Sequence, residues 1–297
     1  MPSTNSTFAL SIDHVAHFVP DGESASAALS RLGFTLTPLS AQSHRLQADG
    51  PLVPAGTSNR CVMLRQGYLE FLTPTHDTPN AQQLRDAIAR YVGVHLIAFG
   101  TQAAGEDHAR LQREGFDPLP PVALQRQAET PDGEATARFT VVRVAPATMA
   151  EGRIQFCQHH TPDVVWQPRW LGHANHAVGL AGVLVCVADP AQTAWRYARF
   201  TGLPVSESHG TWRLDTARGY VLFTDATTLQ HALGISPPAL PWIAGYLIDS
   251  DDMNATRRMT GGNALGERLC VSLPPALGGL MIFQPSGSAP FNLHQAK

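Results

Sequence analysis

The sequence predicts an α+β fold in which four βαβββ modules pair into two half-barrel domains. The main observation is an order of elements (a strand, a helix and three more strands) that recurs four times along the 297 residues. A second observation is a glycine followed by an apolar residue after three of the four helices. The third is composition, because 43% hydrophobic residues are enough to bury the cores of two domains of about 150 residues each.

The first module opens with an alternating apolar strand over Ser11 to Val19. Asp21 to Leu32 follows as a short helix, which Gly33-Phe34 ends. Three strand-like segments complete the module, separated by glycine and proline turns: one around Arg45, one at Arg60 to Leu64 and one at Tyr68 to Leu72.

The other three modules repeat this order. The second has its first strand at Val94 to Gly100, its helix at Gly105 to Arg113, and strands near Val122 to Arg126, Ala137 to Val144 and Arg153 to Gln158. The third has a strand at Leu180 to Val187, a helix at Pro190 to Phe200 and a last strand at Gly219 to Phe223. The fourth opens at Trp242 to Ile248 and closes at Leu280 to Phe283.

One module leaves an apolar sheet face uncovered, and pairing two modules buries that face in a barrel-like cup. We therefore predict an N-terminal domain over residues 8–160 and a C-terminal domain over residues 178–286. The segment 161–177, rich in Trp, Pro, His and Asn, either connects the domains or folds over a pocket. The tail 287–297 shows no pattern and is expected to be disordered or loosely attached.

Composition argues against several classes of partner. A net charge of −3 and a single lysine, Lys297, argue against nucleic acid, which requires a clustered basic surface. The longest apolar stretches, such as Leu180 to Ala188, fall far short of the about 20 residues that span a bilayer. The polar N-terminus does not have the layout of a signal peptide, and the four separated cysteines indicate buried free thiols. We expect a cytoplasmic protein with a small-molecule substrate, and a homodimer is possible.

Four short segments follow one another at characteristic spacing: Ile12-Asp13-His14-Val15, Gly56-Thr57-Ser58-Asn59-Arg60, Gly67-Tyr68-Leu69-Glu70, and residues 158–166. Together they resemble the glyoxalase-like family of the vicinal-oxygen-chelate (VOC) superfamily, over about the first 180 residues. Isomerases, extradiol dioxygenases, epimerases and antibiotic-resistance proteins share this scaffold. The resemblance implies one divalent metal ion (Fe, Mn, Ni or Zn), with one ligand from the first and one from the last strand of each module.

In the first module the positions implied by this resemblance are His14 and Glu70. Both lie mid-strand among apolar neighbours, where a carboxylate is costly unless it is paired, protonated or metal-bound. The structural alternative for Glu70 is a buried salt bridge with Arg60 or Arg45, and for His14 a hydrogen-bonded core histidine. Because both residues fall on matching positions, the metal interpretation is favoured.

In the second module the implied positions are His95 and Gln155. Aligning the helix ends would instead put Leu96 at the first position, but His95 is the ligand-capable residue nearby. Gln155 replaces a carboxylate by an uncharged amide, a weaker ligand. His14, Glu70 and His95 would form a two-histidine, one-carboxylate set suited to Fe(II) and usable by Zn, Mn or Ni.

Further candidates surround this set. By strand alternation His159 shares a face with Gln155, so it could be a fourth ligand, a general base or a loop residue. Proton transfer could also involve Glu70, released from the metal. The candidate substrate contacts are Asn59 and Arg60, which could bind a carboxylate or anchor a turn, and, more weakly, His173 and Asn175.

The C-terminal modules carry no such ligands. Gly182 or Val183 matches His14, whereas Leu222 and Met281 stand where Glu70 would be. The second cup is therefore predicted to be structural, a lid or a dimer surface.

The leading functional hypothesis is a metal-dependent enzyme for a small substrate with vicinal oxygens, either a glyoxalase-like isomerase or lyase or a ring-cleaving dioxygenase. The alternative is a non-catalytic binding or resistance protein, which Gln155 favours and the presence of two cups disfavours. A third hypothesis is a metal-free scaffold in which His14 and Glu70 hydrogen-bond to each other.

Overall fold

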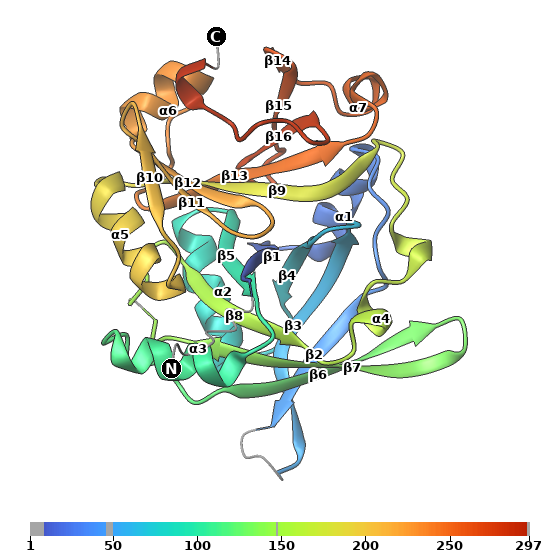
Figure 1. Cartoon of the computed structure of the whole chain (residues 1–297). Coiled ribbons are helices and arrows are strands. Elements are labelled where there is room, and N and C mark those ends of the chain that lie inside the picture. The colour runs from blue at the N-terminus through green and yellow to red at the C-terminus, as the bar shows by residue number, and fades with distance from the viewer. Residues whose placement is uncertain (1–8, 46–49, 147, 296–297) are drawn as a thin grey trace, which may run out of the picture.

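The computed structural model describes residues 9–45, 50–146 and 148–295. Residue 8, the predicted start of the N-terminal domain, and residues 296–297 of the predicted tail lie outside the described residues. Within them, sixteen strands form one continuous sheet with helices packed around it (Figure 1). The predicted α+β fold of four βαβββ modules is confirmed.

The bounds of the modules are close to those predicted. The first consists of β1 (Ser11–Phe18), α1 (Gly22–Arg31), β2 (Ser40–Arg45), β3 (Leu52–Met63) and β4 (Tyr68–Pro74). The second consists of β5 (Gly93–Gly100), α3 (Ala104–Arg113), β6 (Val122–Thr130), β7 (Gly133–Arg143) and β8 (Arg153–His159). The third consists of β9 (Ala177–Cys186), α5 (Pro190–Thr201), β10 (Val205–Ser208), β11 (Thr211–Asp215) and β12 (Tyr220–Thr224). The fourth consists of β13 (Trp242–Ser250), α7 (Met253–Thr260), β14 (Asn263–Leu265), β15 (Arg268–Ser272) and β16 (Leu280–Pro285).

Two helices of eight or more residues between modules were not predicted from the sequence, α2 (Pro79–Arg90) and α6 (Ala226–Leu233). Both begin with a capping side chain. The hydroxyl of Thr78 accepts a hydrogen bond from the Ala81 amide, and the carboxylate of Asp225 accepts one from Thr228. A proline at the start of α2 also favours a helix there, since its fixed φ fits the first turn.

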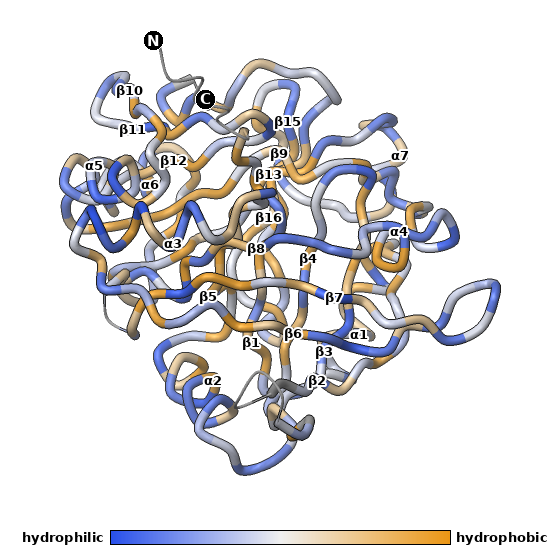
Figure 2. Tube along the Cα trace, turned by 60° about the horizontal axis from the view of Figure 1, so that its bottom comes forward, coloured by the Kyte–Doolittle hydropathy of each residue, from blue (hydrophilic) through white to orange (hydrophobic). Residues whose placement is uncertain are grey.

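The first eight strands close into a barrel, in the order β1-β4-β3-β2-β6-β7-β8-β5 with β5 returning to β1. Equivalent pairings relate the two modules, because Ala16 lies beside Glu70 in the parallel β1–β4 pair as Ala98 lies beside Gln155 in β5–β8. The strands carry apolar stretches, whereas the tip of the β6–β7 hairpin is hydrophilic (Figure 2). The pairing of β2 with β6 joins the two modules and closes the barrel. A ligand site can therefore form inside the barrel.

The other eight strands form an open half-barrel that joins the first barrel through a β5–β13 bridge between Val94 and Ile243. In the described residues its end strands, β10 and β14, are not paired with each other. The concave face is instead filled by the C-terminal segment, whose Phe291 and Leu293 are buried. The prediction of a disordered or loosely attached tail is therefore wrong for this segment, because its apolar side chains complete the second core.

The segment 161–177 contains a short helix, α4 (Pro162–Val165), and a 3-10 turn, η1 (Pro168–Trp170). Val165 packs with Cys61, Met63 and Tyr68 from the barrel strands, and the Trp166 indole donates a hydrogen bond to the Leu64 carbonyl. The segment therefore covers part of the barrel as well as linking the two halves.

None of the helices in the described ranges is long and apolar enough to cross a membrane. All four cysteines are buried and free, as predicted.

His17 connects the barrel to the C-terminal half by two hydrogen bonds. We expect it to make the protein less stable in acid. It is fully buried, its Nδ1 bonds to the Leu277 carbonyl at 2.9 Å and its Nε2 to the Tyr246 hydroxyl at 3.0 Å. Burial lowers the pKa of His17 from 6.5 to about 4. The unfolded chain thus binds more protons between these values, so the stability that His17 provides when neutral falls as the pH drops through this window, by up to about 3 kcal/mol.

We expect the urea midpoint to fall between about pH 7 and about pH 4.5, and a His17→Gln variant to show a flatter dependence. His95, whose pKa burial also lowers to about 4, accounts for part of the remaining slope. An unchanged slope in the variant would contradict this assignment.

Candidate functional site in the N-terminal barrel

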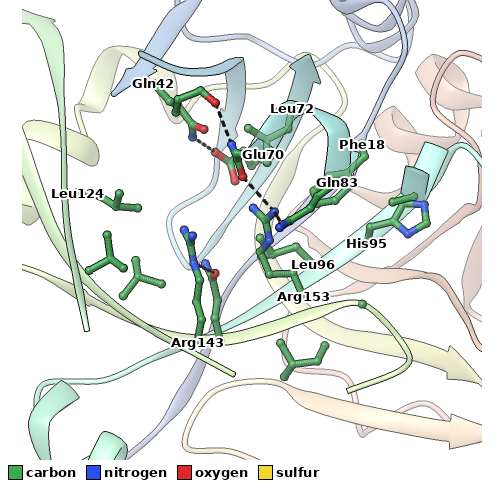
Figure 3. A pocket seen from close by; sticks show the side chains of 18 of the residues that line it. Phe18, Gln42, Glu70, Leu72, Gln83, His95, Leu96, Leu124, Arg143 and Arg153 are labelled. Carbon is green, nitrogen blue, oxygen red and sulfur yellow. Dashed lines mark hydrogen bonds between the residues drawn. The ribbon is translucent and has the colours of Figure 1, made fainter. Parts of the chain in front are cut away.

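A cavity of about 1080 Å³ occupies the barrel interior and opens beside α2. Its wall combines apolar side chains with polar ones, and Gln42 is among the polar groups that hydrogen-bond to Glu70 (Figure 3). Phe18, Leu72, Leu96 and Leu124 represent the apolar part of this lining. A large, mostly apolar cavity with few placed polar groups is typical of a small-molecule site.

His14 and Glu70 are brought together by the adjacent strands β1 and β4. Their Nε2 and Oε2 atoms lie 4.0 Å apart, and both side chains are buried. The other carboxylate oxygen of Glu70, Oε1, accepts hydrogen bonds from Asn59 at 2.5 Å and Gln42 at 3.1 Å. The His14 ring stacks on Tyr68, with 4.4 Å between the ring centroids. Both groups are therefore held rigidly, with one atom of each facing the other.

Asp13 orients His14, a role that the sequence analysis did not foresee. The β1–β5 register shifts between Ile12 and His14, so Asp13 is an extra residue in the strand, a β-bulge. Its Oδ2 atom lies 2.6 Å from Nδ1 of His14 and 3.0 Å from Nε2 of His159. The bulge thus places one buried carboxylate between two imidazoles.

Burial by itself would raise the pKa of the Asp13 carboxyl. The opposing effects of His159, through its charge and its hydrogen bond, and of His14 lower the pKa below its ordinary value. Asp13 is therefore ionised and accepts the Nδ1–H of His14, which leaves the Nε2 atom of His14 directed at Glu70.

His159 reaches this cluster from the end of β8. It contacts Asp13, as above, and its Nε2 lies 3.8 Å from Sγ of Cys157. Its Nδ1 is buried and has no hydrogen-bond partner among the described residues. Within this part of the chain, Asp13, Cys157 and His159 form the group of three potential metal ligands whose donor atoms all lie within 4.8 Å of one another.

His95 is not brought to His14 and Glu70. Its Nε2 donates to the Tyr91 carbonyl at 2.8 Å and its ring stacks on Tyr91 at 4.0 Å. Figure 3 shows it at the side of the cavity, away from Glu70. The strand register explains the placement, because Leu96 is the residue that pairs with Ala16 and faces the interior. The alignment of the helix ends, which put Leu96 rather than His95 at this position, is therefore the correct one.

Gln155 does occupy the position equivalent to Glu70, since each lies beside an alanine of the neighbouring parallel strand. It is buried and lines the cavity. Its amide oxygen accepts the Nε–H of Arg143 at 3.1 Å. The amide oxygen is therefore already used by a cation of the protein, which makes it a poor ligand for a metal.

Of the predicted substrate contacts, Asn59 lies in the cavity and bonds to Glu70, as described above. Arg60 does not line the cavity, because successive residues of β3 point to opposite faces. Its guanidinium group contacts the Thr37 carbonyl at 3.3 Å and the Glu23 carboxylate at 3.6 Å. Of the two roles that the sequence left open, Arg60 has the structural one.

His173 and Asn175 are also structural. His173 donates to the Met63 carbonyl at 2.8 Å and accepts the Thr35 amide at 3.1 Å. Asn175 is fully buried and donates to the Leu32 carbonyl at 2.8 Å. Neither lines the cavity, because the connecting segment passes along the outside of the first module rather than over the opening. Their prediction as substrate contacts is corrected accordingly.

Two arginines at the cavity also escaped the sequence analysis, Arg143 at the end of β7 and Arg153 at the start of β8. Nη2 of Arg153 donates to Asn80 at 3.2 Å and to Gln83 at 3.1 Å, both on α2. Both arginines lie two residues or fewer from an otherwise apolar run, which was the available signal for an inward-facing cation.

The residues present fit a divalent cation with two protein donors, Nε2 of His14 and Oε2 of Glu70. An imidazole whose other nitrogen bonds to a carboxylate, here Asp13, is the usual support for a metal ligand. The four-ligand pattern implied by the resemblance is not assembled, because Leu96 has no donor atom and Gln155 binds Arg143.

With this geometry in place, comparison with known proteins identifies the family. A family model described as a glyoxalase-like domain matches residues 12–201. The chain belongs to this glyoxalase-like family. The match covers the barrel and part of the third module, which agrees with the resemblance of the first 180 residues. No protein with a curated description matches the sequence.

Solved structures show the same fold at low sequence identity. A hypothetical protein from Staphylococcus aureus is 13% identical with a TM-score of 0.64, over 93% of this chain and 99% of that one. A mutant of 4-hydroxymandelate synthase from Streptomyces coelicolor is 14% identical with a TM-score of 0.57, over 98% and 97%. A fusion of a xylose isomerase-like TIM barrel with a 4-hydroxyphenylpyruvate dioxygenase is 12% identical with a TM-score of 0.57, over 99% and 51%. This glyoxalase-like chain thus shares the VOC fold with proteins named as a synthase and as a dioxygenase.

Proposed function

We propose that this glyoxalase-like protein is a divalent-metal-dependent enzyme that acts on a small substrate with two adjacent oxygen atoms inside the N-terminal barrel. The observation that carries the proposal is the His14–Glu70 pair, buried at 4.0 Å in the wall of the 1080 Å³ cavity. A carboxylate and an oriented imidazole facing each other in a largely apolar cavity are suited to general acid–base catalysis.

The chain's own residues supply three parts of the chemistry. Asp13 fixes the tautomer of His14, so that Nε2 presents a lone pair. Asn59 and Gln42 stabilise one oxygen of Glu70 and leave the other directed at the reaction space. Oε2 of Glu70, once released from the metal, can then accept a proton from a substrate carbon or hydroxyl placed next to it.

A metal ion would be held by His14 and Glu70, and when bound it would polarise the two adjacent substrate oxygens as a Lewis acid. With two protein donors, substrate and water would have to supply the other ligands. We therefore expect weak metal binding in the free protein.

The experiment is a calorimetric titration of the metal-free protein with Mn²⁺, Zn²⁺ and anaerobic Fe²⁺. We expect one equivalent to bind to the wild type, and His14→Ala and Glu70→Gln to lose this binding. His76→Ala is the matched control, since His76 is exposed and lies outside the cavity lining. Binding that persists in both variants but disappears in Cys157→Ser would move the metal to the Asp13–Cys157–His159 group. No binding to the wild type would overturn metal dependence.

A second candidate function is a binding protein without catalysis. The specific observation in its favour is that Leu96 and the Arg143-bound Gln155 replace two of the implied ligands. A panel of hydroxy ketones, 2-oxo acids, catechols and lactones separates the two. Turnover that Glu70→Gln abolishes supports the enzyme, and ligand binding unchanged in Glu70→Gln without turnover supports the binding protein.

A further inference from the structure

The charge of the cavity wall is unbalanced. Among the described residues that line it are four arginines (Arg90, Arg126, Arg143 and Arg153) and two acids (Glu70 and Asp86). A net positive lining favours a negatively charged ligand, and an enclosed wall of low polarity strengthens the attraction.

Arg143 and Arg153 are two of these four arginines, and they lie on the adjacent strands β7 and β8. Their described hydrogen bonds go to neutral amide oxygens, those of Gln155, Asn80 and Gln83. Within the described residues, neither guanidinium group lies within 4.0 Å of a carboxylate, whereas nine other arginines of the chain do form such ion pairs. The amides orient the two guanidinium groups without neutralising them, and the charge of Glu70 acts on both without a direct ion pair.

This arrangement is costly without a ligand. Burial and, to a smaller extent, the charge of Arg143 lower the pKa of Arg153 from 12.5 to about 9. Burial also lowers the pKa of Arg143. An anion bound between the two buried guanidinium groups would stabilise both of these positive charges.

The rest of the wall is apolar. Phe18, Leu72, Leu96, Leu124 and Val141 face the same space, and the guanidinium carbon of Arg153 lies 5.6 Å from the centre of the Phe18 ring. A ligand that satisfies this wall has one anionic end and one apolar end.

We propose that the cavity selects organic anions, in which a carboxylate or phosphate binds Arg143 and Arg153 and an apolar body packs against Phe18 and the leucines. This inference names the substrate class of the proposed function and rests on the same cavity. The anionic end binds at the arginines, and the oxygens next to it are then presented toward His14 and Glu70.

The test compares three probes of similar shape in ligand-observed NMR titrations: phenylacetate, its neutral analogue phenylacetamide, and phenyl phosphate. Hydrogen bonds to charged groups contribute about 1.5–3 kcal/mol, so at least one of the anions should bind the wild type about tenfold or more tightly than the amide does. If phenylacetate binds more tightly than phenyl phosphate, the natural ligand is a carboxylate; the opposite order indicates a phosphate.

Arg143→Gln and Arg153→Gln should each reduce this preference about tenfold. Arg143→Lys keeps the charge but not the planar donor pair, so it should keep part of the preference for anions. It replaces Arg143→Gln as the test if that variant does not fold. Arg138→Gln is the matched control, because Arg138 lies on the same strand β7 but is exposed on its outer face.

Three results would overturn the inference: equal binding of anions and amide by the wild type, an unchanged preference in both arginine variants, or no binding of either anion at millimolar concentration. These outcomes are independent of the metal proposal, because His14→Ala and Glu70→Gln should keep the preference for anions. No metal binding by the wild type, together with a retained preference for anions, would refute the metal-dependent function alone.

Discussion

Asp13→Asn is expected to lower the free energy of unfolding by about 3 kcal/mol at neutral pH, although it changes a single atom type. Asp13 is 4% exposed and its Oδ2 bonds to both His14 and His159. An asparagine can place its single acceptor oxygen at the position of Oδ2, but it is uncharged. Both buried contacts with the imidazoles therefore lose the ionic character that strengthens them.

The measurement is urea unfolding of the two proteins at neutral pH, with Asp132→Asn as the control. Asp132 is exposed in the β6–β7 turn, and its replacement should change the free energy of unfolding by less than about 0.5 kcal/mol. Proton NMR of the histidine rings adds a local reading, because the resonances of His14 and His159 should move and those of exposed histidines should not. A loss below about 1 kcal/mol would show that the Asp13 bridge does not hold the cluster.

The order of the modules could be predicted because it depends on local periodicity. Alternation in β1 and the helix signals around α1 lie within a few residues of one another, and the repeat of the pattern identifies the fold even when each copy is weak. The same reasoning located Glu70 and its counterpart Gln155, since both are polar residues in apolar last strands.

The details of the site depend on pairing between distant strands, and these were not predictable. A shift of one residue in a strand reverses the face of every side chain after it, so the choice between His95 and Leu96 depends on how β5 pairs with β1. The bulge at Asp13 is a property of the same pairing. The contact of Arg143 with Gln155 follows from the β7–β8 register, which sets these two residues opposite each other.

The fate of the C-terminal segment was hidden for a similar reason. Phe291 and Leu293 are apolar residues two positions apart, which in isolation predicts little. Their role becomes visible once the second half-barrel is seen to be open between β10 and β14, with an apolar concave face that needs cover. The C-terminal segment is therefore ordered because the second half-barrel is open and needs its apolar side chains to cover the core.

Phe291→Ala is accordingly expected to destabilise the protein by about 3–5 kcal/mol. Phe291 is 4% exposed, its amide donates to the Tyr220 hydroxyl at 2.8 Å and its ring lies 5.4 Å from the guanidinium carbon of Arg268. Removing the ring leaves a cavity between these groups that the sheet cannot collapse to fill. Urea unfolding followed by tryptophan fluorescence measures the loss, with exposed His294→Ala as the control.

The same variant tests the division of labour between the two halves. Phe291 does not line the cavity of the N-terminal barrel, so Phe291→Ala should lower stability and still bind phenylacetate or phenyl phosphate with the wild-type preference over the amide. If the preference falls with the stability, the second half-barrel shapes the binding site and is more than a support. A loss of stability below about 1 kcal/mol would instead show that the tail rests on the half-barrel without completing its core.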